Sequence, residues 1–257
     1  MDRAWTVGFV VLAALVGGCR DNSRAVVPKP KLESVVSADG FPLRVGNNWT
    51  YEGVVRCQKA DAGVRVTTGR VRVTMRVVEE KKTDGASLYL MQGHPADAAW
   101  FEPHGKPGEI VEVLASRYGY LVVANKVFHI DEKRADKVMQ AMKADGFLPL
   151  GLVEANDLEF EFPLVPGNRF GTPDGITRPD FSYCWRVVDA ADKRFAPALP
   201  QGKQPLTAAR CRLVFDTRPD HQIVGFDPTV GITDFAYEHH GTVATVQLIL
   251  TGYNVKR

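Results

Sequence analysis

Arg70 to Val78 read RVRVTMRVV, and this stretch decides the fold class. Its apolar side chains alternate with Arg and Thr, which is the period of a β-strand with one buried face. Similar runs, separated by Gly, Pro and Asp turn signals, continue to residue 255. Further strands are expected at 49–57, 86–92, 109–115, 118–124, 126–130, 158–162, 181–188, 209–216, 221–226, 232–238 and 242–255. The short spacing between them favours antiparallel neighbours.

One segment follows helical spacing instead. Its periodic apolar residues are Ala135, Val138, Met139 and Met142. Asp131 is suited to the N-cap and Gly146 to the position after the last turn, so we expect a helix at 132–145. Because the apolar stripe is narrow, this helix should lie on a sheet. The predicted fold is mainly β: a curved antiparallel sheet, as a partly closed barrel or a sandwich, with one short helix packed on it.

A weak internal repeat occurs in the β-rich part of the chain. Residues 41–49 read FPLRVGNNW and residues 162–170 read FPLVPGNRF, with Phe, Pro, Leu, Gly and Asn at the same offsets. Pro restricts the backbone, Gly-Asn tolerates positive φ, and an aromatic residue, Trp49 or Phe170, follows. We interpret the repeat as a duplicated motif that delivers a buried aromatic anchor into a new strand, rather than as a binding site.

Composition narrows the class of protein. The 257 residues include 32 Lys and Arg against 30 Asp and Glu, a net charge of +2, and 45% are hydrophobic. This profile is typical of a folded chain and argues against a nucleic-acid partner. The chain is long enough to bury a core without cross-links.

The first nineteen residues carry a targeting signal. Trp5 to Gly18 are uncharged, but about 14 apolar residues are fewer than the roughly 20 that span a bilayer. Leu15 to Cys19 (LVGGC) resemble the lipobox of bacterial lipoproteins. That resemblance implies cleavage before Cys19, a diacylglycerol on its thiol and an acyl chain such as palmitate on its amine. Several acyl chains would anchor the protein stably to a membrane.

The domain organisation follows from this signal. We expect a signal peptide at 1–18, a lipid-anchored flexible linker at 19–40 and a β-rich domain at 41–257. Pro28 and Pro30 suit an extended tether. Arg20, where Asp would mark inner-membrane retention in some bacteria, slightly favours the outer membrane.

A second resemblance concerns the ends of the domain. FPLRVGNNWTY at 41–51, GIT at 231–233 and LILTGYNV at 248–255 are similar to a group of uncharacterised β-rich bacterial lipoproteins. The resemblance implies a location in the cell envelope and a β fold, and no activity.

Three cysteines follow Cys19, and an oxidising periplasm predicts one disulfide among them. Strand parity places Cys57 and Cys211 on apolar faces, so their pairing is expected first. Cys184 with Cys211, which flank a Pro-rich connection, stays the alternative.

Catalytic motifs are absent from the sequence: it has no GxSxG, HExxH, CxxC, P-loop or GxGxxG. His94, Glu102 and His104 could bind a metal only if their loop folded back. A periplasmic hydrolase that uses these three residues is the least favoured function. We therefore predict no catalytic residues, no metal and no cofactor.

The remaining polar clusters have structural interpretations. Asp216, Asp220, His221 and Asp227 are expected in a turn, and His239 and His240 at a hairpin. The basic residues Arg65, Arg70, Arg72 and Arg76 are expected to pair with acids on neighbouring strands, although the face could also meet anionic lipid head groups.

Three alternating aromatics, Phe181, Tyr183 and Trp185, are expected along one side of a strand. They would form core or, as the alternative, an apolar ligand face.

Two functional hypotheses remain. The first is a lipid-anchored envelope protein with a non-catalytic structural or binding role, whose partner is the membrane through acylated Cys19. The alternative is a periplasmic carrier or binder of lipid or another apolar ligand, similar to lipoprotein-localisation proteins. Its ligand would lie between the sheet and the helix at 132–145, and strand 242–255, apolar on both faces, motivates it. Protein partners are not specified by the sequence.

Overall fold

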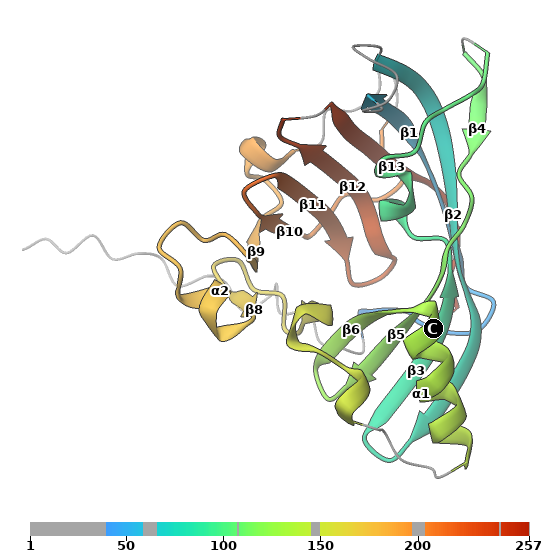
Figure 1. Cartoon of the computed structure of the whole chain (residues 1–257), viewed down its shortest axis with the longest axis vertical. Helices are drawn as coiled ribbons and strands as arrows, with labels where there is room; N and C mark the ends of the chain where they lie inside the picture. Colours follow the sequence, from blue (N-terminus) through green and yellow to red (C-terminus); the bar gives the residue numbers. More distant parts are fainter. Residues whose placement is uncertain are drawn as a thin grey trace, which may run out of the picture. The chain divides into compact units, whose positions relative to one another are not determined.

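The computed structural model describes residues 40–58, 66–106, 108–144, 150–196, 204–241 and 243–256. Thirteen strands form one sheet in this part of the chain (Figure 1). They are β1 (Asn48–Gln58), β2 (Val66–Thr83), β3 (Ala86–Gln92), β4 (Ile110–Glu112), β5 (Arg117–Val123), β6 (Lys126–Asp131), β7 (Leu158–Glu161), β8 (Arg169–Gly171), β9 (Cys184–Asp189), β10 (Cys211–Asp216), β11 (Asp220–Asp227), β12 (Gly231–His239) and β13 (Ala244–Asn254). The predicted β fold is confirmed.

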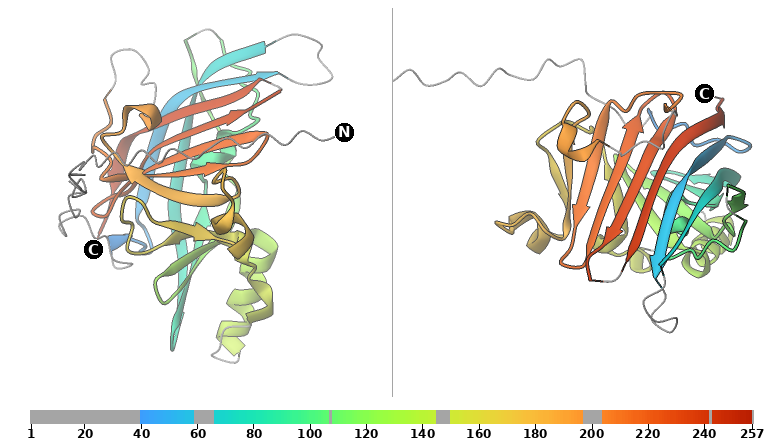
Figure 2. Two further views of the ribbon diagram at one scale, coloured as in Figure 1. Left: turned by 90° about the vertical axis from the view of Figure 1, so that its left-hand side faces the viewer. Right: turned by 90° about the horizontal axis from the view of Figure 1, so that it is seen from above.

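The order of the strands makes the sheet a nearly closed barrel. It runs β7-β6-β5-β3-β2-β1-β13-β12-β11-β10-β9-β8, and β4 adds to β2 in parallel. The first strand therefore pairs with the last, from Asn48 opposite Asn254 to Cys57 opposite Ala244. At the other junction, Cα atoms of β7 and β8 come within 8 Å, but the two strands do not pair. We call this junction the open seam; Figure 2 shows the curvature of the sheet from two further sides.

The repeated motif begins each half of the barrel. In the first copy, Gly46 donates its N–H to the carbonyl of Val77 at 3.0 Å. In the second copy, Gly167 donates to Val187 at 2.8 Å. In each copy the Asn that follows accepts a hydrogen bond in return, at 3.0 Å and 2.9 Å. Both glycines have positive φ, +89° and +99°, as the Gly-Asn turn requires.

The aromatic residues of the motif are anchors in the core. Trp49 is fully buried and its indole donates to the carbonyl of Val230 at 2.6 Å. Phe170 is 2% exposed and stacks on Trp185 at 6.3 Å between ring centroids. The strand-entry interpretation is confirmed in both copies.

Aromatic side chains fill the interior. The ring of Phe41 lies 5.6 Å from Tyr120, 5.4 Å from Phe160 and 5.3 Å from Phe226, between centroids. These rings belong to a continuous cluster of buried residues that reaches both halves of the sheet. Packed side chains thus occupy the middle of the barrel, as in other small barrels.

The helix α1 (Glu132–Ala144) packs on the outside of the sheet near β3 and β5 (Figure 1). Its N-cap is Asp131, whose carboxylate accepts the N–H of Arg134 at 3.0 Å. Its four predicted apolar residues are buried and pack directly against Leu88 and Leu121. The predicted helix is therefore confirmed, but side chains fill the space where the alternative hypothesis placed an apolar ligand.

Neither predicted disulfide is present in the described residues, where Cys57, Cys184 and Cys211 are buried and not bonded to one another. Cys211 lies opposite Asp189, and Cys184 is five residues earlier in that strand, about 16 Å away at about 3.3 Å per residue. Cys57 lies in β1, which three other strands separate from β10. A disulfide needs Cβ atoms within about 4.5 Å. Strand parity predicts the face of a thiol but not its position along the strand or around the barrel.

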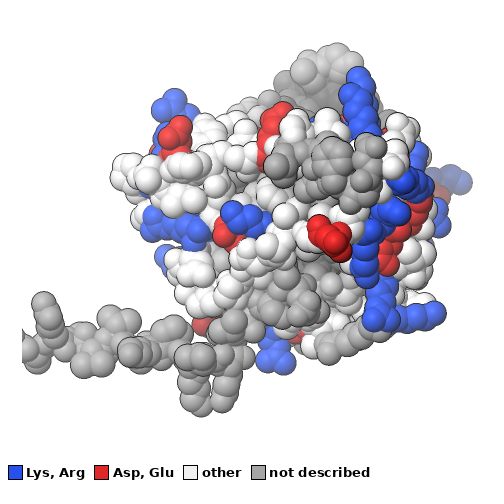
Figure 3. All heavy atoms as spheres, turned by 90° about the horizontal axis from the view of Figure 1, so that it is seen from below, with Lys and Arg blue, Asp and Glu red and all other residues white. Residues whose placement is uncertain are grey.

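The basic face of β2 is paired with polar neighbours, as expected. Arg72 contacts Glu52 at 2.7 Å and Glu112 at 3.1 Å, and Arg70 lies 4.0 Å from Glu52. Arg76 donates to the amide oxygen of Gln92 at 2.8 Å. Arg65 lies outside the described residues. Figure 3, a view from below, shows acidic side chains among the Lys and Arg side chains on that face of the molecule.

Candidate functional site

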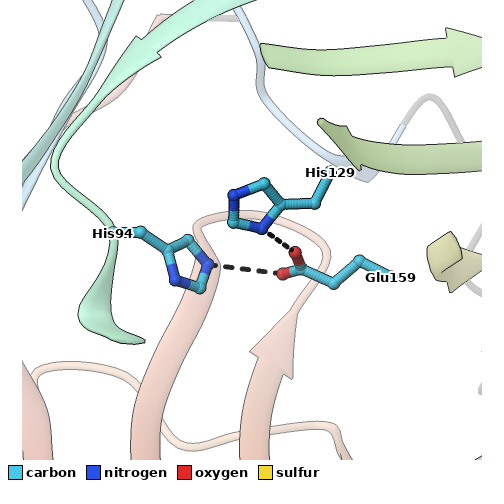
Figure 4. Close-up of side chains that lie close together, drawn as sticks. All are labelled: His94, His129 and Glu159. Atoms are coloured by element: carbon cyan, nitrogen blue, oxygen red, sulfur yellow. Dashed lines mark hydrogen bonds and ion pairs between the residues drawn. The ribbon is translucent and has the colours of Figure 1, made fainter. Parts of the chain in front are cut away.

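Two imidazoles and one carboxylate meet beside the open seam (Figure 4). His94 comes from the start of the short helix η3 (Pro95–Ala98), His129 from β6 and Glu159 from the edge strand β7. Glu159 Oε2 lies 2.8 Å from His129 Nδ1, and Glu159 Oε1 lies 3.4 Å from His94 Nε2. Tyr120 donates its hydroxyl to Oε1 at 2.9 Å. We call His94, His129 and Glu159 the seam triad.

The backbone fixes which nitrogen of His94 carries a proton. His94 is the N-cap of η3, and its Nδ1 accepts the N–H of Ala96 at 3.1 Å. A backbone N–H can only donate, so the neutral ring must carry its proton on Nε2. That nitrogen lies 3.1 Å from the hydroxyl of Tyr120 and faces Glu159. Nε2 of His94 is therefore a hydrogen-bond donor that faces Tyr120 and Glu159.

Glu159 is a buried but ionised carboxylate. Burial by itself disfavours the charged form, but His94 and His129 and their hydrogen bonds outweigh it, so the pKa of Glu159 lies well below its usual range. The hydroxyl of Tyr120 adds a further donor. The charge is thus stabilised by hydrogen bonds within the barrel.

The spacing of the triad is compatible with a metal site, but the protonation pattern of its ligands is not. The three candidate ligand atoms lie within 4.8 Å of one another, and two His with one Glu are suitable ligands for zinc. A His that ligates through Nε2 must keep its proton on Nδ1 and donate it to an acceptor. In His94, Nδ1 instead receives the N–H of Ala96. The donor set therefore does not fit a metal, and the triad is a hydrogen-bonded network.

His129 connects this network to the surface. Its Nδ1 contacts Glu159, its side chain is 32% exposed, and its ring packs on Tyr118 at 4.4 Å between centroids. When the ring is neutral and Nδ1 donates, Nε2 holds a lone pair. His129 also lines a cavity of about 410 Å³. The carboxylate therefore orients an acceptor at the cavity wall, as in dyads that hold a general base.

Two adjoining cavities follow the open seam. The first has about 410 Å³ and the second about 230 Å³. They share four lining residues: Asn156, Leu158, Trp185 and Phe215. The first also reaches Gln222 and the triad, and the second reaches Thr172 and Tyr183. We call the two cavities together the seam groove.

The predicted stripe of Phe181, Tyr183 and Trp185 is wrong as a strand feature. β9 begins at Cys184, and both Phe181 and Tyr183 have positive φ, 59° and 63°, in a bend before it. Their side chains are exposed, whereas Trp185 is buried. The guanidinium of Arg169 lies 3.7 Å above the ring of Phe181. Left-handed backbone at two residues with bulky side chains costs about 1 to 3 kcal/mol each and is typical of functional surfaces.

Two of the three predicted aromatic residues lie at the groove. Tyr183 lines the second cavity, and Trp185 lines both. Phe181 lines neither.

The candidate metal ligands His94, Glu102 and His104 do not come together in the structure. His104 is 75% exposed and 4.0 Å from Glu102, whereas His94 is buried in the seam triad. The sequence patterns did not identify His129 and Glu159 as site residues. His129 is a polar residue in the otherwise apolar VFHI, but Glu159 is one of two glutamates that alternate with apolar residues in LEFEF, so no local signal marks it.

The other predicted polar residues pair locally. Asp216 contacts His221, and Nδ1 of His239 lies 2.9 Å from Asp220. They lie at the ends of β10 to β12, consistent with their structural interpretation.

Cys19, the predicted lipidation site, lies outside the described residues, as do the predicted signal peptide and most of the linker. Within the described ranges, no helix has the length and apolar character needed to cross a bilayer.

Comparisons with known proteins give little information. No family model matches the chain, and no curated protein does. One similar solved structure is a presumed exported protein with a YmcC-like fold from Bacteroides fragilis, with 10% identity, a TM-score of 0.36, and coverage of 86% of this chain and 99% of that one. Another is a presumed lipoprotein from Parabacteroides distasonis, with 8% identity, a TM-score of 0.35, and coverage of 84% and 98%. Similarity at this level assigns no function, so function is argued from the chemistry of the site.

Proposed function

We propose that this chain is a lipid-anchored protein of the bacterial outer membrane, and that its β domain binds a small polar ligand in the seam groove without converting it. The open seam is the main observation that supports the proposal. Every other neighbouring pair of strands around the barrel is hydrogen-bonded in the described residues. The cavities, the strained bend at Tyr183 and the oriented imidazole of His129 all lie at this junction.

The lining of the groove favours binding over catalysis. Among the described lining residues there is no Ser or Cys to act as a nucleophile beside His129. Two hydroxyl side chains line the groove: Thr172 already accepts the N–H of Gly175 at 3.2 Å as a helix N-cap, and Tyr183 lines the second cavity, which His129 does not reach. The thiol of Cys184, next to Trp185, is buried, and burial raises its pKa. A covalent mechanism thus has no activated group.

The anchor is supported by the sequence LVGGC at 15–19 and by the charged, Pro-containing stretch that follows. An acylated Cys19 would hold the domain near a membrane, and residues 20–40 would give it reach.

Native mass spectrometry of the full chain, extracted from its own envelope in mild detergent, tests the binding role. The wild type should retain a non-covalent adduct that Trp185→Ala loses. Tyr253→Ala is the matched control, because Tyr253 is 46% exposed and lies in β13, away from the groove. No adduct on the wild type, or an adduct that survives Trp185→Ala, would contradict the proposal. A phospholipid adduct would instead support the carrier hypothesis.

A further inference from the structure

We infer that the ligand of the seam groove is an uncharged carbohydrate, a pyranose unit or a short neutral glycan. This inference rests on the proposed binding role and specifies its chemistry. It is supported by the aromatic walls of the groove, by its internally paired charges and by its unengaged polar side chains.

Aromatic rings form one side of the groove. Trp185 and Phe215 lie 5.0 Å apart between centroids, and both line both cavities. Phe170 stacks on Trp185 from within the barrel, which holds the ring in place. Tyr183, 40% exposed, extends this surface at the second cavity. Ring faces of this kind pack against the C–H faces of a sugar, which are apolar although its rim carries hydroxyls.

The charged groups in the groove are already paired. Asp157 receives two hydrogen bonds from the guanidinium of Arg134, at 2.6 Å and 2.8 Å, and Asp131 also contacts Arg134. Glu159 is held within the seam triad. The described lining contains no Lys or Arg. An anionic ligand would find no ion-pair partner, and a cation would have to compete with Arg134, so an uncharged ligand fits best.

Three polar groups in the groove are available to a ligand. The side-chain amides of Asn156 and Gln222 make no hydrogen bond with other described residues, although both line the first cavity. Each amide offers donors and an acceptor, and Nε2 of neutral His129 offers an acceptor. Sugar hydroxyls both donate and accept and can therefore satisfy all three. A purely apolar ligand would remove the same groups from water without compensation.

An extended peptide added between β7 and β8 is the main competing occupant. Inserting a strand requires its neighbours to be about 9.6 Å apart, twice the usual spacing of about 4.8 Å. The two strands come within 8 Å of each other, so the seam is too narrow there for an added strand. Gly171 and Thr172 line the second cavity.

The test uses the full chain in detergent on an array of neutral and acidic glycans, followed by calorimetric titration of each neutral oligosaccharide that binds. We expect binding to at least one neutral glycan, with affinity nearly unchanged between low and high salt. Asn156→Ala and Gln222→Ala should each weaken it about tenfold, as the loss of one hydrogen bond predicts. Tyr253→Ala should leave it unchanged. The melting temperature of each variant checks that it is folded.

The outcomes separate the two proposals. If a native adduct is lost in Trp185→Ala but no neutral glycan binds, the carbohydrate inference is wrong and the binding role stands. A preference for acidic glycans, or an adduct identified as a peptide, would equally overturn it. If no adduct is found on the wild type and no glycan binds, both proposals fail.

Discussion

Glu159 Oε2 lies 2.8 Å from Nδ1 of His129, and the second oxygen of the same carboxylate lies 3.4 Å from Nε2 of His94. One buried carboxylate thus links the barrel interior to an imidazole at the wall of the groove. Since β7, which carries Glu159, is an edge strand at the open seam, this link also stabilises the strand that lacks a second partner.

The ionised state of Glu159 predicts a pH dependence of stability. Its pKa is lower in the folded protein than the ordinary value of 4.5, so the unfolded chain takes up the proton first as the pH falls. The stabilisation is complete above pH 4.5 and is lost as the pH falls below that value. Urea unfolding over this range should show a steep loss of stability in the wild type and a shallower one in Glu159→Gln. If stability fell equally steeply with pH in both proteins, the pKa of Glu159 would not be lowered in the folded state.

Removing the carboxylate should destabilise the barrel at neutral pH. Glu159→Ala leaves the hydroxyl of Tyr120 and Nδ1 of His129 without their acceptor, and a buried group left without its partner costs about 1 to 3 kcal/mol. We expect a total loss of about 2 to 4 kcal/mol in the free energy of unfolding. His104→Ala, at the exposed end of the loop, should change it by less than about 0.5 kcal/mol.

The two motif anchors should be of similar importance. Trp49→Ala and Phe170→Ala each remove a buried ring and should cost about 3 to 5 kcal/mol, as measured by urea unfolding. If one variant kept wild-type stability, that copy of the motif would have lost its structural role.

All three cysteines of the domain should be reduced but protected from reaction. Burial raises the pKa of Cys211 to about 12 and raises that of Cys184, so neither forms a reactive thiolate at neutral pH. Alkylation of the native protein should therefore be slow, whereas denaturation without a reductant should expose three alkylatable thiols besides Cys19. Recovery of only one would demonstrate a disulfide.

The proposed lipid anchor depends on one residue. Cys19→Ala should abolish palmitate labelling and leave a precursor or a soluble product, because no other Cys follows an apolar run that ends in small residues. Globomycin should accumulate the precursor of the wild type. Labelling that persists in Cys19→Ala would rule out the lipobox.

Local sequence patterns predicted most of the fold, because alternation and turn residues act over a few positions. Twelve of the thirteen strands lie at predicted ranges. The exception is β8, whose three residues are too few to show a period, although the motif before it indicated a new strand. The stripe at Phe181 failed for a related reason, since two residues with positive φ interrupt the alternation.

The seam triad could not be predicted, because its members come from three separate elements, η3, β6 and β7, that meet only when the sheet is assembled. His94 and Glu159 are 65 positions apart, and nothing near either residue specifies the order of the strands. The disulfide prediction failed for the same reason, because the pairing of two cysteines depends on which strands are neighbours in the sheet.

The pairing of β1 with β13 also determines when the domain can fold. Asn48 and Asn254 are partners although about 200 residues separate them, so this contact has a very long loop to close. During synthesis the barrel cannot be completed until residues 244–254 have emerged. Until then the chain presents two unpaired strand edges, at β1 and at β12, which are surfaces that a chaperone would have to cover.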